Sequence, residues 1–230
     1  LKLPIGGAGR LGTAIHKAAE VHDLAVMAGI SVDLSACDEA LNNSIWNPDE
    51  EVDWGDLDQN TAEATGQALV RKYITEIAPT QKYIGVEVSA EPLTLSDVGI
   101  TLTGTIDRIY ETEDGSVGIG DIKTGKTAVS ADGTVKTSGH AVQMGVYTLL
   151  ASHALQEPMN APARIYGLTT GKTAKGQHVG IGEIESPMTT LLGDEDHHGL
   201  LHHPANILKT ALFFGNAKSQ LCSPKYCPAY

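Results

Sequence analysis

Two stretches of alternating residues joined by a tight turn constrain this chain more than any other feature. Residues 99–110 are predicted to form a strand, because positions 100–107 alternate between apolar or glycine residues and Thr or Asp. Residues 117–123 form a second, shorter predicted strand. Between them, the segment 113–116 reads Glu-Asp-Gly-Ser, which is typical of a tight turn. The pattern therefore predicts a β-hairpin, in which the position of each residue decides its face and its cross-strand partner.

The predicted hairpin brings three charged residues together. With the turn centred near Asp114, Asp107 falls roughly opposite Asp121, and Lys123 lies two residues further along the same strand. Two neighbouring carboxylates repel each other, so a bound cation or a shared proton is expected between them. Mg²⁺ suits such a pair, and a lysine beside it can stabilise charge on a reacting phosphate. The alternative interpretation is a simple ion pair between Asp121 and Lys123.

The rest of the chain predicts helices before and after a sheet. We expect helices at 11–28, 61–77, 139–156 and 205–214, and further strands at 82–91, 163–169 and 178–185. Residues 29–60 are interpreted as a polar loop, with Thr61 as the N-cap of the second helix. This order predicts an α/β fold with a central mixed β-sheet flanked by helices. We expect residues 1–230 to form one domain, with a cysteine-containing tail from about residue 216.

Composition limits the classes of partner and compartment. The net charge of −12 argues against tight, sequence-specific binding of duplex DNA, but is neutral for an enzyme that grips phosphates through bound cations. No stretch approaches the ~20 apolar residues that span a bilayer, and no signal-peptide pattern opens the chain. Three cysteines do not make a disulfide framework. We therefore expect an intracellular, cytoplasmic protein that does not bind membranes.

Four short segments, taken together, resemble a known family. They read GTAIH at 12–16, GTIDR at 104–108, DIKTGK at 121–126 and QMGVY at 143–147. In this order they resemble the motifs of the RecB-like branch of the PD-(D/E)XK nucleases, over about residues 12–147. The resemblance implies a restriction-endonuclease-like fold. It also implies metal ligands at His16, Asp107, Asp121 and the Ile122 carbonyl, a catalytic Lys123, and DNA contacts from Gln143 and Tyr147.

Each of these flanking residues also has a plainer interpretation. His16 can be a structural histidine on its helix, and Gln143 and Tyr147, four residues apart, can be a helix surface with one core tyrosine. Three further acidic residues are possible members of the site. Glu20 shares a helix face with His16, whereas Glu87 and Glu91 lie on the strand before the hairpin, and the sequence leaves open which of these two faces the metal.

Two nucleotide-binding strings are present and neither is preferred. Residues 7–12 match G-x-G-x-x-G with Asp33 downstream, but Pro4 interrupts the preceding strand and no alternating βα series follows. Residues 120–127 match a P-loop, but Asp121 would bring a carboxylate into the phosphate cradle. A turn is also expected after it in place of the long helix that a P-loop requires.

Two groups of possible ligands for other metals are weighed in the same way. The cluster of His197, His198, His202 and His203 is interpreted as a polar surface segment. Some RecB-like nucleases hold a [4Fe–4S] cluster with three C-terminal cysteines and one cysteine ahead of the leading histidine. Here Cys222 and Cys227 are the possible tail ligands, but Cys37 follows His16 and a third tail cysteine is missing. We therefore do not expect a cluster in this chain.

These observations favour a Mg²⁺- or Mn²⁺-dependent deoxyribonuclease. The resemblance suggests a phage-derived exonuclease that acts on DNA ends or single strands. It also suggests a role in recombination or repair, with a recombination protein as a partner. Two alternatives stay open. One is a catalytically silent DNA-binding module with the same fold, and the other is a P-loop nucleotide hydrolase that would depend on Lys126.

Overall fold

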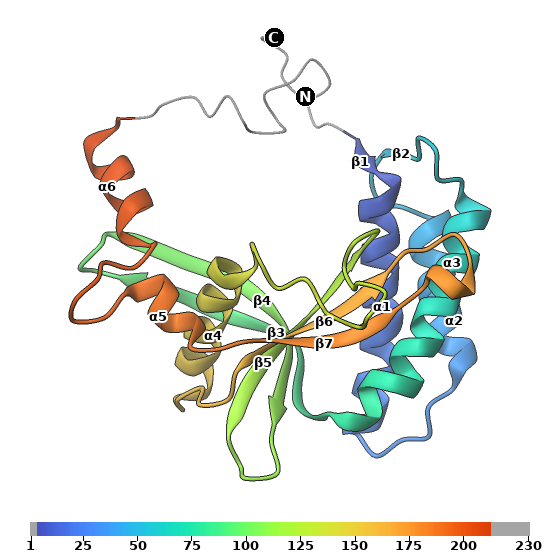
Figure 1. The fold of residues 1–230 in the computed structure, drawn as a ribbon, viewed down its shortest axis with the longest axis horizontal. Helices are drawn as coiled ribbons and strands as arrows, with labels where there is room; N and C mark the ends of the chain where they lie inside the picture. The colour runs from blue at the N-terminus through green and yellow to red at the C-terminus, as the bar shows by residue number, and fades with distance from the viewer. Residues whose placement is uncertain (1–3, 213–230) are drawn as a thin grey trace.

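A five-stranded mixed β-sheet forms the centre of the fold in the computed structural model, which describes residues 4–212 (Figure 1). In spatial order its strands are β3 (Lys82–Leu95), β4 (Ile100–Glu111), β5 (Val117–Gly125), β6 (Ala163–Thr169) and β7 (Val179–Ile184). Neighbouring strands are antiparallel except β5 and β6, which are parallel. A parallel pair needs a crossover connection, and α4 (Ala141–Leu155) lies in the segment that provides it.

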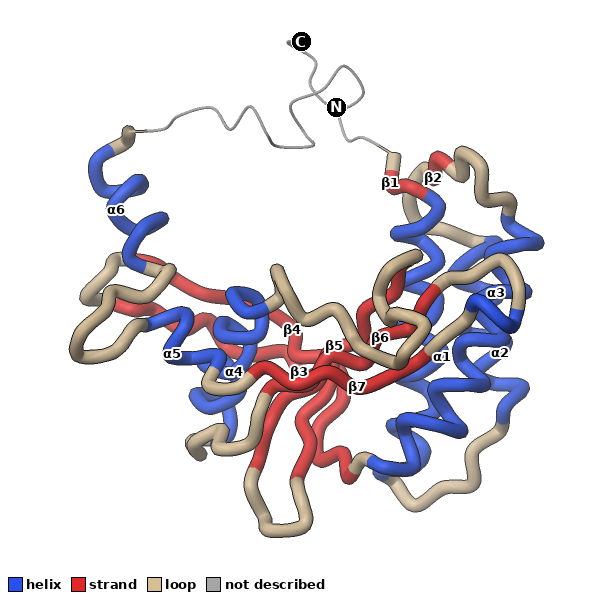
Figure 2. The backbone as a smooth tube through the Cα atoms, viewed as in Figure 1, coloured by secondary structure: helices blue, strands red, loops and turns tan. Residues whose placement is uncertain are grey.

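Helices cover the two faces of the sheet, as Figure 2 shows by colour. On one side lie α1 (Gly7–Met27), α2 (Leu34–Trp46) and α3 (Gln59–Lys72), and on the other lies α4 with α5 (Pro187–Leu192) against it (Figure 1). The smaller elements are β1 (Ile5–Gly6), β2 (Val52–Asp53), a π-helical turn (Tyr73–Ile77), two 3₁₀ turns (Ala78–Thr80 and Ala174–Gly176) and α6 (His202–Thr210). The fold is therefore the mixed sheet flanked by helices that the sequence predicted.

Side chains of β5 pack into two hydrophobic core layers, one on each face of the sheet. Ile122 packs into the layer that contains Ile15 of α1 and Leu69 of α3, whereas Ile119 packs into the layer that contains Met144 of α4. All five side chains are almost completely buried. Burying each large aliphatic side chain contributes roughly 1.5–3 kcal/mol. These two layers fix β5, and with it Asp121 and Lys123, between α1 and α4.

The polar loop predicted for residues 29–60 is wrong over its central part, where α2 forms. Asp33 caps this helix by accepting a hydrogen bond from the Ser35 N–H at 2.8 Å. Cys37, Leu41 and Ile45 recur every four residues and are fully buried. This helical period was present in the sequence, but the polar residues between these positions obscured it.

Several predicted element ends also need correction. The N-cap of α3 is Asp58 and not Thr61, because the Asp58 carboxylate accepts from both the Thr61 N–H (2.9 Å) and the Thr61 hydroxyl (2.6 Å). The first helix begins at Gly7 and the last described helix at His202, each earlier than predicted, and the short α5 was not predicted. Among the described helices, none has both the length and the apolar character needed to cross a bilayer.

Candidate metal and nucleic-acid site

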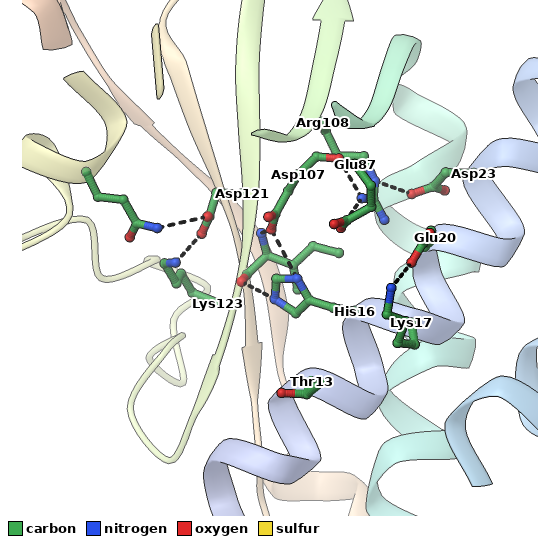
Figure 3. Close-up of polar contacts among 12 residues, drawn as sticks. Thr13, His16, Lys17, Glu20, Asp23, Glu87, Asp107, Arg108, Asp121 and Lys123 are labelled. Carbon is green, nitrogen blue, oxygen red and sulfur yellow. Dashed lines mark hydrogen bonds and ion pairs between the residues drawn. The ribbon is translucent and has the colours of Figure 1, made fainter. Parts of the chain in front are cut away.

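The site forms where β4 and β5 separate. Pairing between the two strands ends at Arg108 and Gly120, so the next residues, Asp107 and Asp121, face one another across the point of separation. Beyond this point the Ile122 N–H of β5 bonds to a side chain of β4. It donates a hydrogen bond to Asp107 Oδ2 at 3.2 Å. The opened ladder thus turns the Ile122 carbonyl and the Asp107 carboxylate toward His16, whereas the Asp121 carboxylate points toward Lys123 (Figure 3).

His16 of α1 joins this group from the other side. Its Nε2 lies 2.8 Å from the Ile122 carbonyl oxygen, and its Nδ1 lies 3.1 Å from Asp107 Oδ2 (Figure 3). Burial acts to lower the pKa of His16, but the hydrogen bond and charge of Asp107, with the charge of Asp121, outweigh it and raise the pKa. The imidazole therefore faces two of the oxygen atoms that the sequence resemblance assigned to a metal.

Glu87 completes a compact set of ligand atoms. One atom each from His16, Glu87 and Asp107 lies within 4.8 Å of the others. Glu87 lies opposite Asp107 on β3 and has a φ of 49°, a left-handed conformation that is strained for a glutamate. Of the two glutamates left open by the sequence, Glu87 faces the group, whereas Glu91 is exposed. Strain at this position is typical of residues held for a function rather than for the stability of the strand.

Glu20, the third possible acidic member, has a different partner. Its carboxylate accepts a hydrogen bond from Lys17 at 2.7 Å on the surface of α1, one turn from His16. It is not part of the compact set formed by His16, Glu87 and Asp107. In this structure Glu20 therefore neutralises a neighbouring lysine.

Asp121 faces a second group of residues. Lys123 Nζ lies 2.5 Å from Asp121 Oδ2, and Gln143 of α4 donates to Asp121 Oδ1 across 3.5 Å. The simple ion pair proposed as an alternative for Asp121 and Lys123 is thus present. It does not account for the acids and the histidine gathered next to it, and those groups distinguish this place from an ordinary ion pair on a sheet.

Tyr147 lies one turn beyond Gln143 on α4 and packs on the sheet. A Cβ atom added at Gly104 would come within 3.2 Å of the Tyr147 ring, so the glycine leaves room for this tyrosine. The half-buried ring thus contacts β4, three residues from Asp107. Gln143 and Tyr147 therefore share the face of α4 that is turned toward the site, as their spacing predicted.

A buried ion pair that the sequence analysis missed holds the backbone of Asp107. Arg108 is completely buried; its Nε donates to Asp23 Oδ2 at 2.6 Å and its Nη1 donates to the Asp107 carbonyl at 2.7 Å. Nη1 also lies 3.5 Å from Glu87 Oε1. Tyr73 and His22 complete the hydrogen bonding of Asp23. An arginine directly after Asp107 in a strand was the one available signal for this pair.

The two nucleotide-binding strings do not form their expected structures. Residues 7–12 lie inside α1 and not in a loop before it, and the strand that precedes them has two residues. Residues 121–125 are part of β5, and the next helix, α4, begins only at Ala141. A phosphate loop needs a helix directly after the glycine-rich segment, so the P-loop alternative is wrong.

The remaining metal-binding suggestions lie elsewhere. The rings of His198 and His202 lie 5.0 Å apart between centroids and are tilted by 44°, but the four clustered histidines are separate from the compact set around His16. Cys37 is buried in the core of α1–α3 as a free thiol. Cys222 and Cys227 lie outside the described residues.

Comparison with known proteins identifies a family. No curated protein matches this chain. The family model of the PD-(D/E)XK nuclease superfamily matches residues 4–229, which is nearly the whole sequence. The central mixed sheet flanked by helices is consistent with the restriction-endonuclease-like fold of that superfamily. This chain belongs to the PD-(D/E)XK nuclease superfamily.

Proposed function

We propose that this chain is a divalent-metal-dependent deoxyribonuclease of the RecB-like branch, with residues 1–230 as a single nuclease domain. One observation carries the proposal. His16, Glu87 and Asp107 converge within 4.8 Å of one another, next to the Asp121–Lys123 pair, where β4 and β5 separate. Membership of the nuclease superfamily supports the same chemistry. On the RecB-like resemblance we further propose exonuclease action on DNA ends or single strands in recombination or repair.

The donor atoms fit Mg²⁺ or Mn²⁺. Carboxylate and carbonyl oxygens suit both ions, and one imidazole beside them favours Mn²⁺ over Mg²⁺. We propose His16, Asp107, Asp121 and the Ile122 carbonyl as the residues that hold the ion, with Glu87 as an additional acidic ligand. The positive charge of the ion would relieve the repulsion between the carboxylates of the two aspartates. When bound, such an ion supplies Lewis acidity toward a phosphate oxygen and a more acidic water.

The other side chains of the site have distinct proposed roles. Lys123 places an ammonium group beside Asp121, where it can hold a phosphate oxygen and stabilise the charge that develops in the transition state. Gln143 already reaches Asp121 and can orient the substrate strand together with Tyr147. The buried Arg108 keeps the Asp107 backbone in place, so it acts as a positioning residue. DNA bound through an ion and these few groups does not require a basic chain, which agrees with the net charge of −12.

Cleavage of end-labelled DNA tests the proposal directly. Linear and covalently closed circular DNA are incubated with Mg²⁺, with Mn²⁺ and with EDTA. We expect degradation of the linear form in either metal, none in EDTA, and survival of the circle. Loss of the circle would replace exonuclease with endonuclease action.

Lys123→Ala and Lys175→Ala form the matched pair for this assay. Lys175 is an exposed lysine in the turn Ala174–Gly176, away from the site, so its replacement should leave cleavage unchanged. Lys123→Ala should abolish most of it. Equal activity of the wild-type protein and both variants would contradict the proposed site. DNA binding without cleavage in any metal would favour the silent binding module.

A further inference from the structure

A pocket of about 690 Å³ lies beyond the end of β5, outside the metal site. Its walls come from the start of α1, the segment between β2 and α3, the first half of α3, the end of β5 with the loop after it, and the loop that follows β6. Trp54, Thr124, Lys126 and Lys172 line it, together with the acidic Asp56. More of its lining is apolar than polar, so an occupant with both a flat apolar part and a charged part suits it.

Two glycines explain why α1 approaches this pocket so closely. A Cβ atom added at Gly7 would lie 2.9 Å from the Trp54 ring, and one at Gly12 would lie 2.9 Å from the Thr124 hydroxyl. The G-x-G-x-x-G string that does not bind a dinucleotide thus has a different structural role here. Its first and last glycines let α1 pack against two walls of the pocket.

The polar and aromatic groups in the pocket are free to meet a ligand. Lys126 and Lys172 are exposed, and neither forms an ion pair with another residue of the part of the chain that the structure describes. Trp54 is half-buried, with one part of its ring against Gly7. A stacking surface beside two lysines is the combination that binds a nucleotide of single-stranded DNA, with the base on the ring and the phosphate on the amines.

The pocket also lies at a suitable distance from the metal site. Lys126 follows Lys123 by three residues at the end of β5, which corresponds to about 10 Å of extended chain. Thr124, between them, lines the pocket. A DNA strand whose phosphodiester bond lies at Asp107 and Asp121 can therefore continue toward Trp54.

We propose that this pocket binds one unpaired nucleotide of the DNA strand that is cut. The inference rests on the proposed nuclease function and adds a second contact point for the substrate. Trp54 stacks on the base, and Lys126 and Lys172 hold the adjoining phosphate. Such a pocket gives the enzyme a preference for single strands or frayed ends, because a base within an intact duplex cannot reach it.

Binding of a short fluorescent oligothymidylate in EDTA tests this, because no cleavage occurs there. We expect Trp54→Ala, and separately the double variant Lys126→Ala/Lys172→Ala, each to weaken binding by about 5- to 100-fold, the effect of losing one stacked base or its phosphate contacts. Trp54→Phe should recover most of the affinity. The controls are Trp46→Ala, an exposed tryptophan on α2, and Lys175→Ala, both expected to bind as the wild type does.

Two further measurements separate stacking from a merely structural role. In a Trp46→Phe background, Trp54 is the remaining tryptophan of the chain, and its fluorescence should be quenched by the oligothymidylate. Binding of a blunt, fully paired duplex should respond little to Trp54→Ala. Trp54 packs on the core of α1–α3, so thermal melting of each variant is recorded. If Trp54→Ala unfolds, the double variant Lys126→Ala/Lys172→Ala still tests the pocket.

The outcomes distinguish this inference from the nuclease proposal. Wild-type affinity in the double lysine variant, or the absence of quenching, would overturn the pocket assignment even if cleavage with Mn²⁺ is normal. Quenching and weakened binding in the variants would support the pocket even if the wild type cleaves nothing, in which case the nuclease proposal fails alone. Tighter binding of thymidine monophosphate than of the oligothymidylate would assign the pocket to a free nucleotide and overturn the strand proposal.

Discussion

Asp107 and Asp121 are both largely buried, yet their surroundings shift their pKa values in opposite directions. Burial acts to raise the pKa of Asp107, but the hydrogen bond and charge of His16, with the Ile122 N–H, outweigh it and lower the pKa. For Asp121, burial and the nearby charge of Asp107 raise the pKa, and Lys123 offsets only part of this. Two neighbouring carboxylates of the same type therefore differ in how well the protein alone stabilises their charge.

The difference teaches that the site has two unlike halves. The half on α1 and β4 supplies His16, Glu87 and Asp107, a set of possible ligands already compact and already paired within the protein. The half on β5 and α4 supplies Asp121, whose charge is under-compensated, with a lysine and a glutamine close by. We infer that the first half supplies most of the metal affinity, and that the second half adds one ligand, Asp121, and acts on the phosphate through Lys123.

Replacing each aspartate in turn gives the largest expected effect. Asp107→Asn and Asp121→Asn should both reduce cleavage by more than about 10³-fold, the upper end of the loss caused by removing one electrostatic contact in a transition state. They should differ in Mn²⁺ affinity, measured by isothermal titration calorimetry. Asp107→Asn should lose most of the binding because it removes a member of the compact set, whereas Asp121→Asn should weaken it less, because Asp121 is a proposed ligand outside that set.

The opposite ranking of Mn²⁺ affinities would reverse the assignment of the two halves. Asp97→Asn is the control, because Asp97 is an exposed aspartate in the turn between β3 and β4 and should leave Mn²⁺ binding unchanged. Equal Mn²⁺ affinities in both aspartate variants would mean that the site acts as one unit and that its two halves do not differ in function.

The Arg108–Asp23 pair supports only the first half, and its loss should be the next largest effect. Arg108→Met leaves the Asp23 carboxylate buried without its cationic partner, which should lower the free energy of unfolding by about 3–5 kcal/mol. Urea denaturation measures this. Arg164→Met, which removes an arginine paired with the more exposed Glu183 on β7, should lower it by only about 1 kcal/mol or less. If Arg108→Met loses no more stability than Arg164→Met, the buried pair does not hold Asp107 in place.

Sequence reasoning found the parts of the molecule that follow from local pattern. Alternation and turn residues predicted the β4–β5 hairpin and the opposition of Asp107 to Asp121, and family resemblance added His16 and the Ile122 carbonyl from separate parts of the chain. Periodicity also predicted α4 and with it the shared face of Gln143 and Tyr147. These features depend on residues a few positions apart or on a recurring motif.

The missed features depend on tertiary structure. The choice of Glu87 over Glu91 depends on a left-handed backbone conformation at Glu87, which no local signal in a strand of alternating residues announces. The Arg108–Asp23 pair joins residues 85 positions apart in the chain. α2 was missed for a different reason, since its buried residues have helical spacing but lie in a mostly polar segment.

Lys123 tests the second half alone. Lys123→Ala should reduce kcat by about 10²- to 10³-fold, because it removes one cation that stabilises charge on the reacting phosphate. Mn²⁺ affinity should change little, since Lys123 lies outside the compact set. Single-turnover cleavage at saturating Mn²⁺ measures the first quantity and calorimetry the second. A large fall in Mn²⁺ affinity would place Lys123 with the metal-binding half.

The smallest expected effect concerns Glu87. Two variants distinguish the effect of its backbone conformation from the effect of its carboxylate. Glu87→Gly removes a side chain from a residue with φ of 49°, a conformation that glycine adopts freely, so the free energy of unfolding should rise by about 1 kcal/mol. Glu87→Gln keeps the strain and should leave stability nearly unchanged. Both variants should bind Mn²⁺ more weakly, because both lack the carboxylate. If Glu87→Gly gains no stability, the left-handed backbone is not strained by the side chain. If neither variant loses Mn²⁺ affinity, Glu87 belongs to the scaffold, and the first half of the site is reduced to His16 and Asp107.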